Sequence, residues 1–356
     1  MKLGAYFWDG WYAKIPHWTD RLMRDFTCRE PVWGWQGSTV ENMELQINYA
    51  ADAGLSFFAF DWYYPQNGKV SEMNNAVDRF LASSNHNRMK FCLLVANHEG
   101  GYIFRDKLED ACRRFMPYLT NDDALKVDGK PVIIFFLADS LIEKLGGEKE
   151  CAKCLGYLKQ QAKAAGLPGV YVMACVNPPR DSNGDLEKAP HNWEKFCRSA
   201  EEAGIDALTG YNYHRGKIVR NNEISYIFPY NDMAAEHCES WDRFSSASNL
   251  PYMPIVIGGW DCRPWETIWE GKTVPQPRSC YSPDRTPSDV YNHILDADKW
   301  LKENSEKAVE DLAIIYAWNE NGEGGFIEPT FGDRGKTLEF VGKAIKDANA
   351  QIISEE

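Results

Sequence analysis

Eight short hydrophobic segments recur along the chain, and residues that favour turns bound each of them. The segments are nearly continuous rather than alternating. This is typical of strands buried on both faces, as in parallel sheets. In chain order the predicted strands are LGAYFW (3–8), LSFFAFDW (55–62), MKFCLLVA (89–96), PVIIFFLA (131–138), GVYVMACV (169–176), DALTGYNY (206–213), MPIVIGGW (253–260) and LAIIYAW (312–318).

Stretches with helical spacing of apolar residues lie between these strands. The clearest predicted helices are residues 39–54, 150–166, 194–204 and 287–304. Strands that alternate with helices over short loops predict a parallel sheet, and eight such repeats predict a closed (β/α)8 TIM barrel. An open doubly wound sheet is the alternative. Such a sheet usually carries a glycine-rich phosphate turn after its first strand, and YFWDGWY is not one.

Three long segments interrupt the regular alternation, and they are residues 9–38, 177–193 and 261–287. Each follows a predicted strand, so we expect all three to lie as long βα loops over the C-terminal face of the barrel. Trp33 and Trp35 in the first segment fit either a lid that stacks on a ligand or a small satellite core. We find no second domain. The prediction is a single catalytic domain, residues 1–348, followed by a C-terminal tail, residues 349–356.

The formal net charge of −13 limits the range of partners. Nucleic acids and anionic membrane surfaces are bound through basic patches, so neither is expected as a partner. No run of eighteen apolar residues is present, so we predict no membrane insertion. The oligomeric state is left open.

The cysteines and the N-terminus bear on localisation. The ten cysteines have no framework spacing, and Cys92 and Cys175 lie inside apolar strands, which favours a reducing compartment. KLGAYFW reads as a core strand where a secretion signal would stand. We therefore expect a cytoplasmic protein. If a signal has been trimmed before Met1, the protein would instead be periplasmic or extracellular.

Polar and aromatic residues gather after the C-terminal ends of the predicted strands, where a barrel of this kind places its chemistry. The opposite ends carry ordinary turn and solvent residues such as Lys90 and Lys130. A carbohydrate-binding site needs both aromatic and polar residues, because the C–H faces of sugars stack on aromatic rings while their hydroxyls bond to carboxylates and amides. The predicted carbohydrate-binding residues at these ends are Asp9, Trp11, Asp61, Trp62, Tyr63, Asn97, His98, Tyr211, Asn212, Tyr213, Trp260, Asp261 and Asn319.

The segment AWNENGEGGFIEP (317–329) follows the last predicted strand and carries three carboxylates, of which Glu328 is a further candidate for substrate binding. Glu320 and Glu323 are three residues apart among glycines, so a turn can point both into one pocket. Like charges held close raise one pKa, which suits a proton donor in glycosidic cleavage. They could instead be solvated charges or partners of Arg334, but their position after a barrel strand favours a catalytic pair.

The sequence lacks the common motifs for phosphate, nucleophile and zinc chemistry, and His98 has two possible interpretations. The sequence contains no P-loop or nucleophile elbow, and the CxxC formed by Cys151 and Cys154 has no second pair at zinc spacing. We therefore predict neither a metal nor a cofactor. His98 fits either a sugar contact or the cap of a loop.

The same segment resembles the WNEWxEGxxxEP signature of glycoside hydrolase family 99 and of its bacterial WbsX-type relatives. Further segments are similar in the same order along almost the full length. They are LGAYFWDGWY, AGLSFFAFDWYY, VDGKPVIIFF and RTPSDVYNHI. The resemblance departs from the signature at Asn321 and Gly322, where the family has Trp and a variable residue.

The resemblance implies a (β/α)8 barrel that hydrolyses α-mannosides with retention and without an enzyme nucleophile. Glu320 would deprotonate the sugar 2-hydroxyl, which attacks C1. Glu323 would protonate the leaving oxygen and then activate water. The departure at Asn321 removes a bulky wall, so the sugar and the endo or exo mode stay open.

From the residues and the resemblance together we predict a retaining glycoside hydrolase that acts on α-linked glycans. A first alternative is a WbsX-type glycosyltransferase that builds lipopolysaccharide or O-antigen polysaccharide. That activity would need a sugar-nucleotide site, and the sequence shows neither a phosphate-cradling turn nor an Asp-x-Asp pattern. A second alternative is a barrel that binds carbohydrate without catalysis.

Overall fold

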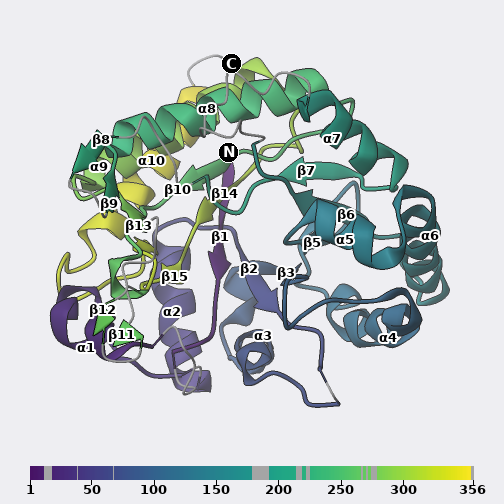
Figure 1. Cartoon of the computed structure of the whole chain (residues 1–356), viewed down its shortest axis with the longest axis horizontal. Helices are drawn as coiled ribbons and strands as arrows, with labels where there is room; N and C mark the ends of the chain where they lie inside the picture. The colour runs from purple at the N-terminus through teal and green to yellow at the C-terminus, as the bar shows by residue number, and fades with distance from the viewer. Residues whose placement is uncertain are drawn as a thin grey trace.

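Eight parallel strands form one curled sheet at the centre of the molecule (Figure 1). The computed structural model describes residues 1–11, 18–37, 39–66, 68–178, 192–213, 219–221, 225–265, 268–269, 272–273 and 279–353. The sheet order is β10-β14-β1-β2-β3-β5-β6-β7. The strands are β1 (Lys2–Phe7), β2 (Phe57–Trp62), β3 (Lys90–Val95), β5 (Lys130–Phe135), β6 (Tyr171–Cys175), β7 (Ala207–Thr209), β10 (Ile255–Ile257) and β14 (Leu312–Tyr316).

The two end strands of this sheet, β7 and β10, meet and close the barrel. An isolated parallel bridge joins Leu208 to Tyr252, just before β10. The amide of Met253 donates to the carbonyl of Leu208 at 2.9 Å, and the Thr209 hydroxyl donates to the carbonyl of Met253 at 2.9 Å. These bonds satisfy backbone groups that an open edge would leave to solvent.

Helices surround the barrel on its outer side, because their apolar faces pack on strands that are mostly hydrophobic. The N-terminus of α9 shows the local cause of one boundary: Thr286 and Asp289 form a capping box and Pro287 occupies the first turn. The helices are α1 (Asp20–Asp25), α2 (Val40–Asp52), α3 (Asn75–Ala82), α4 (Leu108–Leu119), α5 (Ala138–Leu145), α6 (Glu148–Ala164), α7 (Asn192–Glu202), α8 (Tyr230–Ala247), α9 (Pro287–Glu303) and α10 (Lys336–Ile353).

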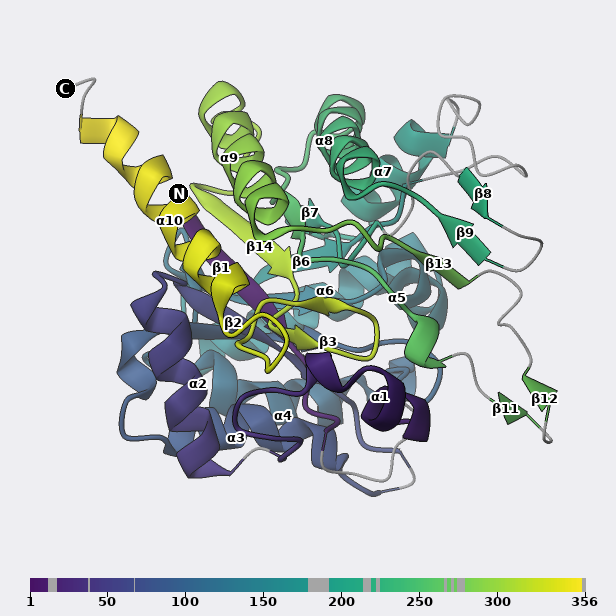
Figure 2. The same ribbon diagram turned by 90° about the vertical axis from the view of Figure 1, so that its left-hand side faces the viewer.

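The remaining elements are short and lie in the connections. The 3-10 turns are η1 (Thr27–Arg29), η2 (Glu72–Asn74), η3 (His86–Arg88), η4 (Arg105–Lys107) and η5 (Arg263–Trp265). The small strands are β4 (Lys126–Val127), β8 (Val219–Asn221), β9 (Ser225–Ile227), β11 (Ile268–Trp269), β12 (Lys272–Thr273), β13 (Ser279–Tyr281), β15 (Asn319–Glu320) and β16 (Gly325–Phe326). Figure 2 shows β8, β9, β11 and β12 gathered on the side toward which β1 and β14 run.

The predicted fold is confirmed: all eight strands are present within a few residues of their expected positions, and they form the predicted barrel. The helices expected at 39–54, 150–166, 194–204 and 287–304 correspond to α2, α6, α7 and α9. Most of the segment 177–193 lies outside the described residues. Helix α10 runs to Ile353, so it extends into the segment expected as a tail.

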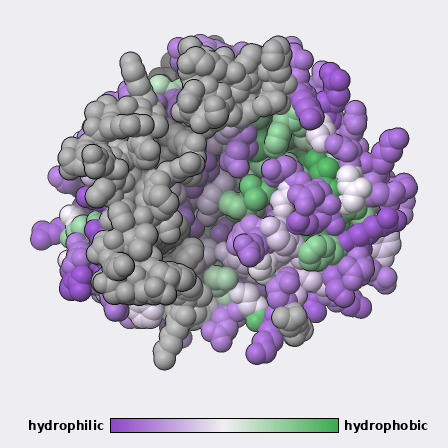
Figure 3. Space-filling model, viewed as in Figure 1, coloured by the Kyte–Doolittle hydropathy of each residue, from purple (hydrophilic) through white to green (hydrophobic). Residues whose placement is uncertain are grey.

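Three further features of the structure concern the cysteines, the helices and the surface. Nine cysteines are free thiols, namely Cys28, Cys92, Cys112, Cys151, Cys154, Cys175, Cys197, Cys238 and Cys262, and Cys151 and Cys154 are buried on α6. No helix within the described ranges is long and apolar enough to cross a membrane. Figure 3 shows the barrel face seen in Figure 1, where hydrophobic residues gather near the middle and hydrophilic residues lie toward the right-hand edge.

Candidate active site

Glu320 and Glu323 lie on one tight hairpin that follows β14. The hairpin pairs β15 with the antiparallel β16, and the amide of Glu323 donates to the carbonyl of Glu320 at 3.1 Å. Gly325 is required here, because a Cβ at this position would lie 2.1 Å from the ring of Tyr316. The glycine-rich sequence therefore folds the chain back so that both glutamates belong to one turn at the rim of the barrel.

A different tyrosine holds each glutamate. The hydroxyl of Tyr211, which follows β7, donates to Oε1 of Glu320 at 2.8 Å. The hydroxyl of Tyr316, the last residue of β14, donates to Oε2 of Glu323. The rings of Tyr211 and Tyr316 pack edge to face with their centroids 4.9 Å apart. The two glutamates and the two tyrosines therefore form one packed unit.

Burial raises the pKa of both glutamates into the range near neutral pH. It raises the pKa of Glu320 to about 7, although the hydrogen bond from Tyr211 opposes the shift. It raises the pKa of Glu323 to about 8. Groups that titrate near the working pH are efficient in proton transfer, so this pair can both accept and donate a proton at neutral pH.

Asp61 adds a third carboxyl group to the same volume. It is the penultimate residue of β2 and is buried. Burial first, and then the nearby charges of Glu320 and Glu323, raise the pKa of Asp61 well above its usual value. Within the described part of the chain its Oδ1 atom has no hydrogen-bond partner. A buried polar atom of this kind is costly unless a ligand satisfies it.

An arc of aromatic rings borders the three acids. Ring-centroid distances along the arc are 5.9, 5.6, 4.7, 4.9 and 6.2 Å, in the order Tyr63, His98, Phe136, Tyr211, Tyr316 and Trp260. Phe136 and Tyr316 were absent from the predicted site, because both lie within apolar runs that read as buried strands. The signal that could have found them is an aromatic residue where a strand ends, since Phe136 directly follows β5 and Tyr316 is the last residue of β14. Such an arc can stack against the C–H faces of sugar rings.

Three of the predicted residues bond mainly to the protein itself. The side-chain amide of Asn319 makes two bonds to the backbone of Trp8, at 2.9 and 2.7 Å. The side-chain amide of Asn97 makes two bonds to the backbone of Leu137, at 3.0 and 2.8 Å. The carboxylate of Asp261 is paired with two arginines. These internal bonds explain why the three side chains lie at the rim of the barrel, without any contact with substrate.

A second group of predicted residues surrounds a small cavity beside the site. Asp9, Trp11 and Glu328 line this cavity, whose volume is about 10 Å³. The indole N–H of Trp11 donates to the carbonyl of Asn319 at 2.9 Å. Glu328 is buried and burial raises its pKa well above the usual value, with Asp333 as a further negative neighbour. The cavity is no larger than a single water molecule requires.

The structure does not bring Trp62 or Tyr213 to the three acids. Trp62 alternates with Asp61 along β2, packs against Phe115 with centroids 5.0 Å apart, and lines a separate groove of about 350 Å³ beside α3 and α4. Tyr213 is buried, and its hydroxyl lies 2.8 Å from that of Tyr252. Asn212, between Tyr211 and Tyr213, is half-buried. Within the described residues no group of three or more His, Cys, Asp or Glu could hold a metal ion.

Comparisons with solved structures match this fold over nearly its whole length. Two structures of the GH99 endo-α-mannosidase from Bacteroides thetaiotaomicron have TM-scores of 0.64 and 0.61, at 15% identity. In both cases the match covers 98% of this chain and 97% of the other. A structure described as a glycoside hydrolase-like protein has a TM-score of 0.61 at 15% identity, and covers 96% of this chain and 93% of its own. At these identities the likeness concerns the fold.

Two further comparisons concern the sequence. No curated protein matches the chain. The family described as "Glycosyltransferase WbsX" matches residues 35–341, a range that includes Asp61, Tyr211, Glu320 and Glu323. Because this match spans most of the chain, and because the resemblance noted in the sequence points the same way, the protein belongs to the WbsX family, with a barrel like that of the GH99 endo-α-mannosidases.

Proposed function

We propose that this protein is a retaining glycoside hydrolase that acts on an α-linked glycan, with Glu320 and Glu323 as its catalytic pair. The observation that carries the proposal is the hairpin on which both glutamates are held by tyrosine hydroxyls. Their pKa values of about 7 and about 8 suit a base and an acid at neutral pH. The fold shared with endo-α-mannosidases supports this choice.

In the proposed reaction Glu320 removes the proton from the 2-hydroxyl of the sugar, whose oxygen forms a bond to C1. Glu323 donates its proton to the glycosidic oxygen as the C1–O bond breaks. Glu323 then takes a proton from water, and that water opens the 1,2-anhydro ring at C1 while Glu320 returns its proton to O2. Two inversions at C1 give net retention. If the 2-hydroxyl does not participate, Glu320 would instead attack C1 directly.

The remaining site residues have proposed roles in binding. Asp61, with its unsatisfied Oδ1, would bond a sugar hydroxyl. The aromatic arc from Tyr63 to Trp260 would stack on the rings of the glycan. We keep Asn97, Asn319 and Asp261 as secondary candidates, because their side-chain polar atoms already bond within the protein.

The experiment compares Glu320→Gln and Glu323→Gln with wild type on aryl and alkyl α-mannosides and on a panel of α-linked glycans. We expect kcat/KM to fall by about 10²- to 10⁴-fold for each variant, with the anomeric configuration retained in wild-type products by NMR. Glu339→Gln, an exposed change on α10, is the matched control. If both active-site variants keep wild-type kcat/KM, the assignment is refuted.

The family description favours one other function, a glycosyltransferase that uses a sugar nucleotide. Calorimetry with nucleotide sugars separates the two, because micromolar binding would favour the transferase. A barrel that only binds glycans would release no reducing sugar, and its affinity would not change in the glutamate variants.

A further inference from the structure

Arg29 reaches the catalytic hairpin from a segment 292 positions away in the chain. It is the last residue of η1, and its side chain is buried. One guanidinium nitrogen donates both to the carbonyl of Asn321, at 3.0 Å, and to the carbonyl of Asp261, at 2.9 Å. Asn321 directly follows Glu320, so Arg29 holds the backbone of the hairpin that carries both glutamates.

Asn321 completes a reciprocal contact with Arg29. Its side-chain amide donates to the backbone carbonyl of Arg29 at 2.7 Å, and the residue is fully buried. A tryptophan at this position, as in the WNEWxEG signature, could not form that bond with its side-chain amide, since it has none. In this chain the hairpin is therefore secured by polar contacts where the signature places an apolar ring.

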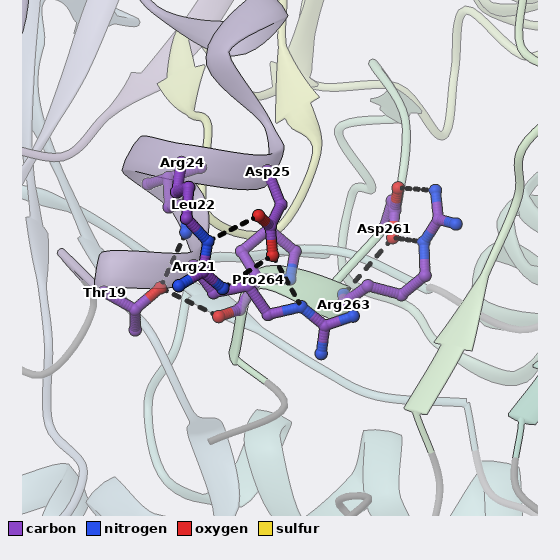
Figure 4. A network of polar contacts seen from close by, with 8 residues as sticks. All are labelled: Thr19, Arg21, Leu22, Arg24, Asp25, Asp261, Arg263 and Pro264. Atoms are coloured by element: carbon purple, nitrogen blue, oxygen red, sulfur yellow. Dashed lines mark hydrogen bonds and ion pairs between the residues drawn. The ribbon is translucent and has the colours of Figure 1, made fainter. Parts of the chain in front are cut away.

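Asp261 links the same cluster to Glu323. Its amide donates to the carbonyl of Glu323, and Gly324 leaves no room for a side chain, because a Cβ there would lie 2.7 Å from that amide nitrogen. Its carboxylate forms ion pairs with Arg29 and with Arg263. The forked guanidinium of Arg263 donates one hydrogen bond to each carboxylate oxygen, at 2.8 and 2.7 Å. Figure 4 shows this fork beside the α1 segment.

The surroundings of Arg29 fix its orientation. Its guanidinium carbon lies 4.6 Å from the centre of the Phe26 ring, a cation–π contact. The segment around α1 is tied down in turn, since the hydroxyl of Thr19 donates to the carbonyl of Pro264 at 2.8 Å (Figure 4). A planar, multidentate guanidinium can hold two carbonyls and a carboxylate together, and a lysine ammonium cannot reproduce that geometry.

We propose that Arg29, acting through Asn321 and Asp261, is a positioning residue that sets the orientation of Glu323 as the general acid. The proposal rests on the catalytic role proposed above for the hairpin. Arg29 touches no reacting atom. Its contribution is the placement of the backbone on both sides of Glu323, and a displacement of about 1 Å at a catalytic group can cost about 10²-fold in rate.

The test measures kcat and KM for Arg29→Met and Arg29→Lys on two α-glycosides, one with a dinitrophenyl and one with an alkyl leaving group. Proton donation matters mainly for the alkyl glycoside. We expect kcat of Arg29→Met to fall about 100-fold on the alkyl glycoside and less than about 10-fold on the dinitrophenyl glycoside. KM should stay within about 2-fold, and Arg29→Lys should recover part of kcat.

Arg24→Met is the matched control, because Arg24 lies on α1 nearby but is exposed and pairs with its neighbour Asp25. The carboxylate of Asp261 keeps its bonds to Arg263 when Arg29 is replaced, which favours a folded variant. If Arg29→Met does not fold, Arg29→Lys and Asn321→Ala are measured in the same way and decide the question.

Equal losses on both substrates, in proportion to the folded fraction seen by circular dichroism, would overturn the positioning role and leave Arg29 a structural residue. If the glutamate variants lose activity while Arg29→Met does not, only this inference fails. If the glutamate variants keep wild-type activity, the proposed function fails and this inference falls with it.

Discussion

Tyr211 donates its hydroxyl hydrogen to Oε1 of Glu320 over 2.8 Å. The donor follows β7 and the acceptor lies on the hairpin after β14, so the bond joins two strands that lie on either side of β10 in the closed barrel. A hydrogen bond to an ionised carboxylate favours that form, so this bond supports the role of a base that we propose for the buried Glu320.

The first prediction follows from this bond. Tyr211→Phe removes the donor, so the pKa of Glu320 should rise and the acidic limb of the pH dependence of kcat/KM should move to higher pH. We expect activity at neutral pH to fall by about 10-fold, since a bond to a charged group contributes about 1.5–3 kcal/mol. Tyr118→Phe, which removes a hydroxyl that donates to Asp78 far from the site, should leave the profile unchanged.

The second prediction concerns the pH optimum. Activity requires Glu320 ionised and Glu323 protonated, and their pKa values are about 7 and about 8. The profile of kcat/KM should therefore be a narrow bell that rises as pH passes about 7 and falls as it passes about 8. In Glu323→Gln the alkaline limb should be lost, as measured on a substrate with a good leaving group. A flat profile from pH 5 to 9 would contradict these roles.

The third prediction separates function from stability at Asp61. Its folded-state pKa is raised, so the unfolded chain releases this proton at lower pH than the folded protein does, and Asp61 weakens the fold at neutral pH. Asp61→Asn should raise Tm at pH 7 by about 3 °C and lower kcat/KM. The gain in Tm should vanish as pH falls below the pKa of Asp in an unfolded chain, about 3.9. A lower Tm at pH 7 would count against a costly buried carboxyl.

The fourth prediction concerns two glycines. Gly325→Ala should abolish activity, because a Cβ would meet the Tyr316 ring at 2.1 Å and push the hydroxyl away from Glu323. Gly156→Ala is the control, since Gly156 lies inside α6 with nothing within 4 Å of an added Cβ. That change should keep activity and raise the free energy of unfolding by about 0.5–1 kcal/mol. Wild-type kcat in Gly325→Ala would contradict a role in activity for the contact between the Tyr316 hydroxyl and Glu323.

The fifth prediction is acid sensitivity of the core between α8, α9 and β10. His293 is buried there beside His237, and both burial and this neighbour hold the pKa of His293 well below its usual value. Below about pH 6.5 the unfolded chain binds a proton that the folded protein does not, so stability should fall by up to about 1.4 kcal/mol per pH unit. Urea unfolding at pH 7 and pH 5.5 should show a smaller loss in His293→Gln. An equal loss in both proteins would assign the effect to other groups.

The sequence determined the barrel because burial on both faces leaves a local signature. Each of the eight strands is a nearly continuous apolar run, and such runs recur where a parallel strand is covered by helices. The placement of Glu320 and Asp61 at one rim followed from the same reading, since parallel strands all end on one face.

Tertiary structure decided which of the rim residues lie close to one another. Asp61 and Trp62 are adjacent, yet the pleat sends them to opposite faces of β2, and only the closed barrel shows which face is interior. Asn97, Asn319 and Asp261 bond to backbone or arginine partners that no local pattern identifies. The contact of Arg29 with Asn321 joins opposite ends of the chain, and such contacts depend on how the whole barrel closes rather than on any run of neighbouring residues.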